Sequence, residues 1–264
     1  MKVKLALLFV FVSSFSLNAQ VLVGPVIGGQ STWIVFDDKD YKDFNTVIPA
    51  YGFHAGGNLS FRVQKRFFLH TSIIYSQKAK TIKGKLDPDL NNKLRNHFIE
   101  MPIMYTVEFK GNLGKGNKEF KWYLGAGPNI SYWMGGSGTI SSSELTELNI
   151  EKLKYKIVFN KTYEEQKDNQ MNVNDPNRMQ LGLNLSAGMV FEPLPDQKYM
   201  LTARYELGHS FYSGTSTGTF KQTLDEDVMR VRNQGIWISL AYLIDLKPSE
   251  RKRGKSTLDN KKRK

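Results

Sequence analysis

Apolar and polar side chains alternate with a period of two along much of the chain. The odd positions of 99–109 hold Ile, Met, Ile, Tyr, Val and Phe, whereas Glu100 and Glu108 occupy even positions. This alternation predicts a β-strand with one apolar face and one polar face. A turn rich in Gly, Asn and Lys spans 110–118, and the alternation resumes over 120–133. The two segments therefore predict a β-hairpin.

Six further segments extend the prediction to eight strands; five show the same pattern, and 21–33 is apolar and Gly-rich with a blurred alternation. They are 21–33, 51–63, 67–76, 179–191, 199–211 and 234–246. Most are close to the ~9–11 residues that a tilted strand needs to cross a bilayer. Short turns alternate with long connections, so every short turn falls on one side of the sheet. The long connections are 34–49, 77–96, 134–178 and 212–233. Within the third of them the alternation returns at 153–157, which predicts a hairpin extending outward.

The direction of the apolar face separates two kinds of eight-stranded barrel. A soluble barrel would place this face inside around a small ligand, whereas a membrane barrel would turn it toward lipid. The opposite face is rich in Gly, Ser and Asn, which suits a crowded lumen better than a surface in water. Aromatic residues lie near the strand ends of the apolar face, where membrane barrels carry their girdles. They are Tyr51, Tyr75, Trp122, Tyr132, Tyr199 and Tyr242.

These observations favour the membrane barrel. We predict an all-β domain over residues 20–246, an eight-stranded antiparallel transmembrane up-and-down β-barrel with long extracellular loops. Its predicted location is the cell outer membrane, so outer-membrane lipids are its first expected partners.

Both ends of the chain differ from this domain. Residues 1–19 have a basic start, an apolar stretch and a small-residue end, which predict a secretory signal peptide. The formal net charge is +12, and 247–264 alone contain nine Lys or Arg against two acidic residues. This composition predicts a basic disordered periplasmic tail. The body is close to neutral, so we expect no nucleic-acid partner.

The tail is a candidate partner-binding segment. Its charge would suit an acidic periplasmic protein, anionic headgroups or a peptidoglycan-associated protein, and the alternative is a solubilising tail without a partner. The candidate residues are Arg251, Lys252, Arg253, Lys255, Lys261, Lys262, Arg263 and Lys264.

Charged residues also occur on the face predicted to line the lumen. They are Arg62, Glu100, Lys121, Arg204 and Glu206. Ionisable groups at membrane depth are often functional, which would indicate a gate or a proton path. The alternative, which we favour, is an ion-pair network centred on Glu100 and Arg204 that fills a narrow lumen and holds the barrel rigid.

Catalysis has little support in the sequence. The four His residues lie on separate strands or loop edges, without the spacing of metal ligands. The acidic run at 37–43 lacks the Gly and the terminal Glu of a calcium-binding loop. We therefore expect a non-enzymatic protein with no catalytic, cofactor-binding or metal site and no cofactor.

Several short motifs, together with the signal peptide, resemble the PorT family of small outer-membrane barrels. The motifs are Gly-Phe-His-Ala-Gly at 52–56, Ile-Ile-Tyr-Ser-Gln-Lys at 73–78, Ile-Glu-Met-Pro at 99–102 and Tyr-Leu-Gly-Ala-Gly-Pro at 123–128. The resemblance covers nearly the whole mature chain up to about Leu246. It implies an outer-membrane barrel. Because the founding member is implicated in protein export by the type IX secretion system, it also suggests a role in that apparatus.

Three functions follow as hypotheses. The first is an accessory or assembly component of an envelope complex, such as the type IX secretion apparatus, with protein partners bound by the basic tail or the extracellular loops. The second is a passive structural barrel. The third is a barrel enzyme acting on lipid or peptide, which would need a Ser/His/Asp cluster at the rim that the sequence does not reveal. We expect the first.

Overall fold

The computed structural model describes residues 20–113, 118–194, 197–214 and 217–246. The signal peptide predicted at 1–19 and the basic tail predicted at 247–264 lie outside these residues, so both stay predictions. No helix among the described residues is long and apolar enough to cross a membrane.

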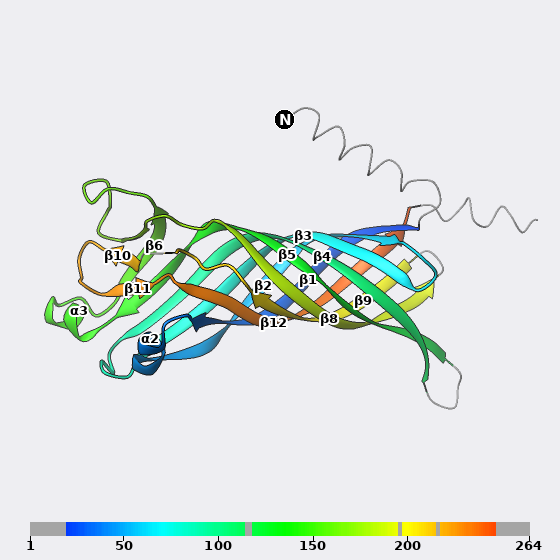
Figure 1. Cartoon of the computed structure of the whole chain (residues 1–264), viewed down its shortest axis with the longest axis horizontal. Helices are drawn as coiled ribbons and strands as arrows, with labels where there is room; N and C mark the ends of the chain where they lie inside the picture. The colour runs from blue at the N-terminus through cyan, green and yellow to red at the C-terminus, as the bar shows by residue number, and fades with distance from the viewer. Residues whose placement is uncertain (1–19, 114–117, 195–196, 215–216, 247–264) are drawn as a thin grey trace, which may run out of the picture.

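Eight long antiparallel strands form a closed barrel (Figure 1). They are β1 (Val21–Phe36), β2 (Asn45–Arg62), β3 (Phe67–Gly84), β4 (Asn91–Leu113), β5 (Lys118–Ser141), β8 (Met179–Leu194), β9 (Gln197–Gly208) and β12 (Val231–Asp245). Each pairs with the next along the chain, β5 pairs with β8, and the ring closes between β1 and β12. This up-and-down order confirms the predicted fold class. We call the two ends of the barrel the turn end, with the short turns, and the loop end.

The apolar face of the strands points outward. Leu183 and Ile238 are 47% and 51% exposed, while their chain neighbours Asn184 and Trp237 are fully buried. A soluble barrel around a ligand would have the reverse arrangement. The closed ring also pairs the backbone N–H and C=O groups between strands, as a hydrocarbon surrounding requires.

The predicted aromatic residues form two belts on this outer face. Tyr75 and Tyr132 are the cross-strand neighbours of Ile99 toward the loop end. Toward the turn end, Tyr199 pairs with Tyr242, and Trp122 lies on β5. Trp122 and Tyr132 are ten residues apart on that strand, about 33 Å along it, or about 25 Å along the axis of a tilted barrel. This separation matches the apolar band of a membrane barrel.

Strands β3 and β4 extend well beyond their predicted ends. The prediction of a loop over 77–96 was wrong, because β3 continues to Gly84 and β4 begins at Asn91. Only 85–90 connect them. Beyond the membrane the outward side chains face water, so these segments pair as strands without the apolar alternation that would reveal them.

The other long connections also contain regular structure. Their elements are α2 (Lys39–Phe44), α3 (Ser143–Glu147), β6 (Leu153–Phe159), β7 (Gln170–Val173), β10 (Thr217–Phe220) and β11 (Glu226–Val228). Strand β5 continues to Ser141 and pairs with β6, which confirms the outward hairpin predicted from 153–157. These elements make a cap on the loop end of the barrel (Figure 1).

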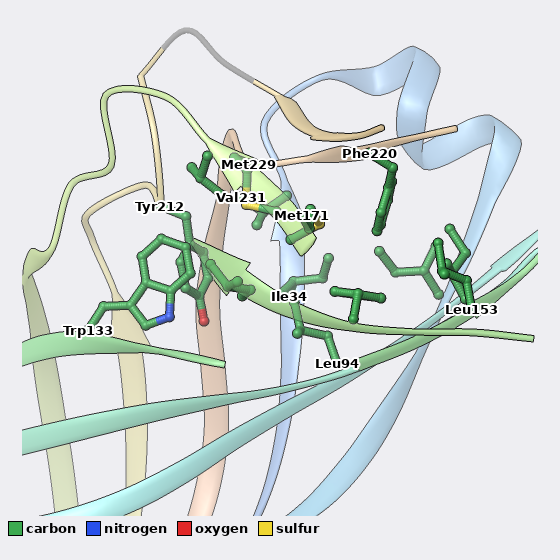
Figure 2. Packing of buried hydrophobic residues seen from close by; sticks show 14 of the residues in the cluster. Ile34, Leu94, Trp133, Leu153, Met171, Tyr212, Phe220, Met229 and Val231 are labelled. Atoms are coloured by element: carbon green, nitrogen blue, oxygen red, sulfur yellow. The ribbon is translucent and has the colours of Figure 1, made fainter. Parts of the chain in front are cut away.

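A hydrophobic core lies where the cap meets the barrel mouth, and we call it the outer cluster. Figure 2 shows Trp133 and Tyr212 beside Met171, Met229 and Val231. Side chains from the barrel strands and from the loop elements contribute together, so the cap and the barrel mouth form one packed unit. The buried members are Ile34, Ile82, Leu94, Phe98, Trp133, Ile140, Leu145, Leu153, Tyr155, Ile157, Met171, Val173, Tyr212, Phe220, Met229 and Val231.

Candidate functional site

Four charged side chains meet inside the barrel and form what we call the lumen network. Lys78 Nζ lies 2.9 Å from Glu100 Oε1 and 2.7 Å from Glu206 Oε1. Arg204 Nη2 lies 3.4 Å from Glu100 Oε2. All four side chains are at least nine-tenths buried. Two cations thus face two carboxylates, and the network is neutral as a whole.

The surroundings of the network hold it in one geometry. Ser76 donates a hydrogen bond of 2.6 Å to Glu100 Oε1. Lys78 Nζ and Arg204 Cζ lie 5.5 and 4.8 Å from the ring centroid of Trp237, whose π face favours cations. Removing one partner from a buried ion pair leaves an uncompensated charge, which costs about 3–5 kcal/mol. The network therefore makes the lumen rigid.

The structure brings together three of the five charged residues predicted for the lumen. Glu100, Arg204 and Glu206 belong to the network, but Arg62 and Lys121 do not. Arg62 lies exposed at the turn end, where it donates hydrogen bonds to the carbonyls of residues 64 and 65. Lys121 Nζ pairs at that end with Glu192 Oε2 at 2.8 Å, both partly exposed. The period of two assigns a residue to a face and leaves its depth along the barrel undetermined.

Sequence reasoning missed the central cation of the network, Lys78. The residue falls in the segment predicted as a loop, yet Ser76, Lys78 and Lys80 all point inward at every second position of β3. Lys80 Nζ makes a second buried ion pair, 2.8 Å from Asp227 Oδ1. The polar residues at every second position of 76–80 were the signal of this inward row.

The His residues of the lumen have structural partners. His54 Nδ1 lies 2.6 Å from Gln30 Oε1 and its Nε2 lies 2.7 Å from Ser239 Oγ. Both nitrogens of His70 contact side-chain hydroxyls. Among the described residues, no group of three His, Cys, Asp or Glu is placed to hold a metal ion.

A second apolar cluster fills the lumen on the other side of the network. We call it the turn cluster, and it consists of Leu22, Val26, Ile74, Tyr123, Val190, Met200, Ala241 and Leu243. A cavity of about 60 Å³ lies beside it, lined in part by His54, His70 and Arg204. Such a volume holds about two water molecules. The lumen is therefore filled at three levels, by the outer cluster, the lumen network and the turn cluster.

Comparison with known proteins agrees with this architecture. The family described as "outer membrane protein beta-barrel domain" matches residues 13–212. No curated protein matches the chain.

Among solved structures, the chain is similar to Neisserial surface protein A, with 12% identity over 87% of this chain and 100% of that one and a TM-score of 0.40. OprG from Pseudomonas aeruginosa has 10% identity over 86% and 94%, with a TM-score of 0.42. Ail from Yersinia pestis has 11% identity over 85% and 99%, with a TM-score of 0.34.

Proposed function

Because the chain belongs to the outer membrane protein β-barrel domain family, we propose that this outer-membrane protein is a non-enzymatic accessory or assembly component of an envelope complex. The observation that carries the proposal is the filled lumen. Among the residues that the structure describes, ion pairs and two apolar clusters occupy the interior, and we infer that they close it to metabolites. We therefore expect such a barrel to act by binding partners at its surfaces.

The cap offers a surface for a protein partner. Short turns of outer-membrane barrels are periplasmic, so we take the loop end as the extracellular side. Leu86, Leu148 and Leu224 are 78%, 51% and 89% exposed there. Hydrogen bonds join α3 to the turn after β3 and to the segment before β11, and these three parts carry the leucines. Exposed apolar groups on an ordered support are typical of protein interaction sites.

The resemblance to the PorT family supports the type IX secretion apparatus as the complex in question. The basic residues predicted in the tail, such as Arg251 and Lys262, would add a contact on the periplasmic side. A passive structural barrel is the second candidate, because a filled lumen also makes a barrel rigid. A barrel enzyme is the least supported of the three, since the network residues pair with one another.

The test is the secretion of a type IX cargo protein by a strain that lacks this chain. The strain is complemented with the full chain, with a chain lacking 247–264, or with a chain carrying Leu86→Ser, Leu148→Ser and Leu224→Ser. We expect the deletion to abolish cargo secretion while the envelope still resists detergent. The Ser variant should secrete less at an unchanged amount of folded barrel. Normal secretion combined with detergent sensitivity would instead support the passive barrel and contradict our proposal.

A further inference from the structure

Four exposed cationic side chains surround one groove on the outside of the barrel at the loop end. Two of them come from β4 and two from β6, and β5 runs between these strands. The strand register sets them in two rows, each with one small hydroxyl residue of β5 in the middle. The groove has a volume of about 620 Å³. We call it the basic groove, and its members are Lys93, Arg95, Ser137, Thr139, Lys154 and Lys156.

The walls of the basic groove are fixed and close enough to share an anion. Strands β4 and β6 lie two strand spacings apart, or about 10 Å, so cations from both walls can reach one phosphate group above the hydroxyls of β5. Leu94 and Tyr155 alternate with the cations and are buried in the outer cluster. Tyr155 also donates a hydrogen bond of 2.6 Å to Asn92 Oδ1. The cations therefore project from a packed support.

The charge of the basic groove is uncompensated. Two buried or partly exposed cations elsewhere at the loop end do have carboxylate partners, Lys80 with Asp227 and Arg230 with Asp37. None of the four groove cations has a carboxylate within 4.0 Å among the described residues. Four like charges around one groove repel one another, and a bound anion would relieve this repulsion. A phosphate carries about −2, so two phosphate groups would balance the four cations.

The position of the groove fits the headgroup layer of a membrane. Tyr51, an aromatic residue of the belt toward the loop end, lines the groove. Arg95 lies four residues beyond Ile99 on β4, and Ile99 pairs with Tyr75 and Tyr132 of the same belt. Four residues correspond to about 13 Å along a strand, or about 10 Å along the axis of a tilted barrel. Headgroups extend about 5–7 Å beyond the hydrocarbon on each side, so the long Arg95 side chain meets them by reaching a few ångströms back toward the belt.

From this placement we propose that the basic groove binds the phosphorylated headgroup of a lipid of the outer leaflet. The acyl chains of that lipid would lie along the apolar wall below, where Phe53, Ile73 and Ile99 are exposed. Arg95 would bind phosphate oxygens with two parallel N–H groups, and the lysines would add charge. This inference is independent of the proposed role in an envelope complex, because it concerns the lipid that surrounds the barrel.

The test uses the full folded barrel in neutral detergent and measures lipid binding by native mass spectrometry. The probes are a bisphosphorylated diglucosamine lipid, the same lipid without its phosphates, and inorganic pyrophosphate. We expect the bisphosphorylated lipid to bind at least tenfold more tightly than either of the others. Arg95→Gln should weaken its binding about fivefold, since one surface cation contributes about 1 kcal/mol to binding of an anionic headgroup. The variant with all four cations changed to Gln should bind this lipid more than a hundredfold more weakly than the native chain.

The matched control is Lys39→Gln with Lys42→Gln on α2, which also removes exposed cations at the loop end and should leave the affinity unchanged. Heat-modifiable gel mobility shows that each variant is folded. Equal binding by the four-site variant and the native chain would overturn the proposal. Binding of pyrophosphate as tight as that of the lipid would also overturn it, since the groove would then serve a soluble anion. Equal losses in the control and four-site variants would show an effect of net charge alone and reject the groove.

Discussion

The lumen network and the outer cluster fill neighbouring parts of the same barrel in opposite ways. The network joins four charged groups through three ion pairs, whereas the outer cluster packs apolar side chains from strands and loops. A buried ion pair adds little net stability but requires every partner to be present. An apolar cluster stabilises in proportion to the surface it removes from water. The network should therefore determine the geometry of the barrel, and the cluster should stabilise the cap.

The largest expected effect comes from removing the cation that joins the two carboxylates. Lys78→Met leaves Glu206 without its ion-pair partner and Glu100 with Arg204 alone. We expect the free energy of unfolding to fall by about 3–5 kcal/mol, measured by urea titration of the barrel folded in phospholipid vesicles. A loss below about 1 kcal/mol would show that the network is not the constraint described here.

A second substitution sharpens this result. Combining Lys78→Met with Glu206→Gln leaves the Glu100 and Arg204 pair as the remaining neutral unit. The double variant should recover roughly half of the stability lost by Lys78→Met, because contacting partners are not additive. If the double variant instead loses the sum of the stabilities lost by Lys78→Met and by Glu206→Gln separately, charge balance does not explain the role of the four residues.

A truncation in the outer cluster should act more locally. Met171 is fully buried in this cluster on β7, and a buried Met→Ala change costs about 2–5 kcal/mol through the cavity it leaves. We expect Met171→Ala to make 142–178 sensitive to limited proteolysis while the barrel keeps its heat-modifiable mobility. If Met171→Ala also abolished the heat-modifiable mobility of the barrel, the outer cluster and the lumen network would not have the separate roles described here.

An ion pair at the turn end provides the contrast to the buried network. Lys121 and Glu192 are partly exposed, and exposed pairs contribute about 0–1 kcal/mol. Lys121→Gln should therefore lower the free energy of unfolding by less than about 1 kcal/mol in the same urea titration. An effect as large as that of Lys78→Met would mean that burial does not determine how much stability is lost when an ion pair is broken.

The smallest expected effect is a pH dependence in the cap. Slight burial acts to raise the pKa of Asp87, but hydrogen bonds from Ser143 and nearby backbone N–H groups outweigh it and hold the pKa below its ordinary value of 3.8. The contact between Asp87 and α3 therefore adds stability that is present above about pH 4 and is lost as the pH falls through the lowered pKa. An NMR titration of the Asp87 carboxyl should show this lowered pKa in the native chain and a smaller lowering in Ser143→Ala, which loses the hydroxyl donor but keeps the backbone N–H donors.

The barrel wall could be predicted because lipid imposes a strict rule on the outward positions. Residues such as Leu183 and Ile238 must be apolar at every second position, and eight such segments give the fold. The depth of a residue along the barrel and its pairing partners do not follow from this rule. Arg62 and Lys121 were therefore assigned to the network only because they lie on the inward face of their strands. Lys78 was missed because its outward neighbours lie near or beyond the membrane edge and have no need to be apolar.

The cap could not be predicted for a different reason. Its core combines Met171, Tyr212 and Met229 from short or irregular segments, which have no periodicity to indicate what they contact. Only the 153–157 segment carried a readable alternation, and it became β6. The basic groove was not predicted because its cations come from two strands, β4 and β6, that lie on either side of β5. Its charges converge through the register rather than through their spacing along the chain.

Ion conductance of the purified barrel in planar bilayers tests the central claim most directly. If the outer cluster, the lumen network and the turn cluster fill the interior as described, the native chain should give no stable stepwise current at high salt. A reproducible current of uniform step size, from protein shown to be folded by its heat-modifiable mobility, would contradict a closed lumen and the function proposed from it.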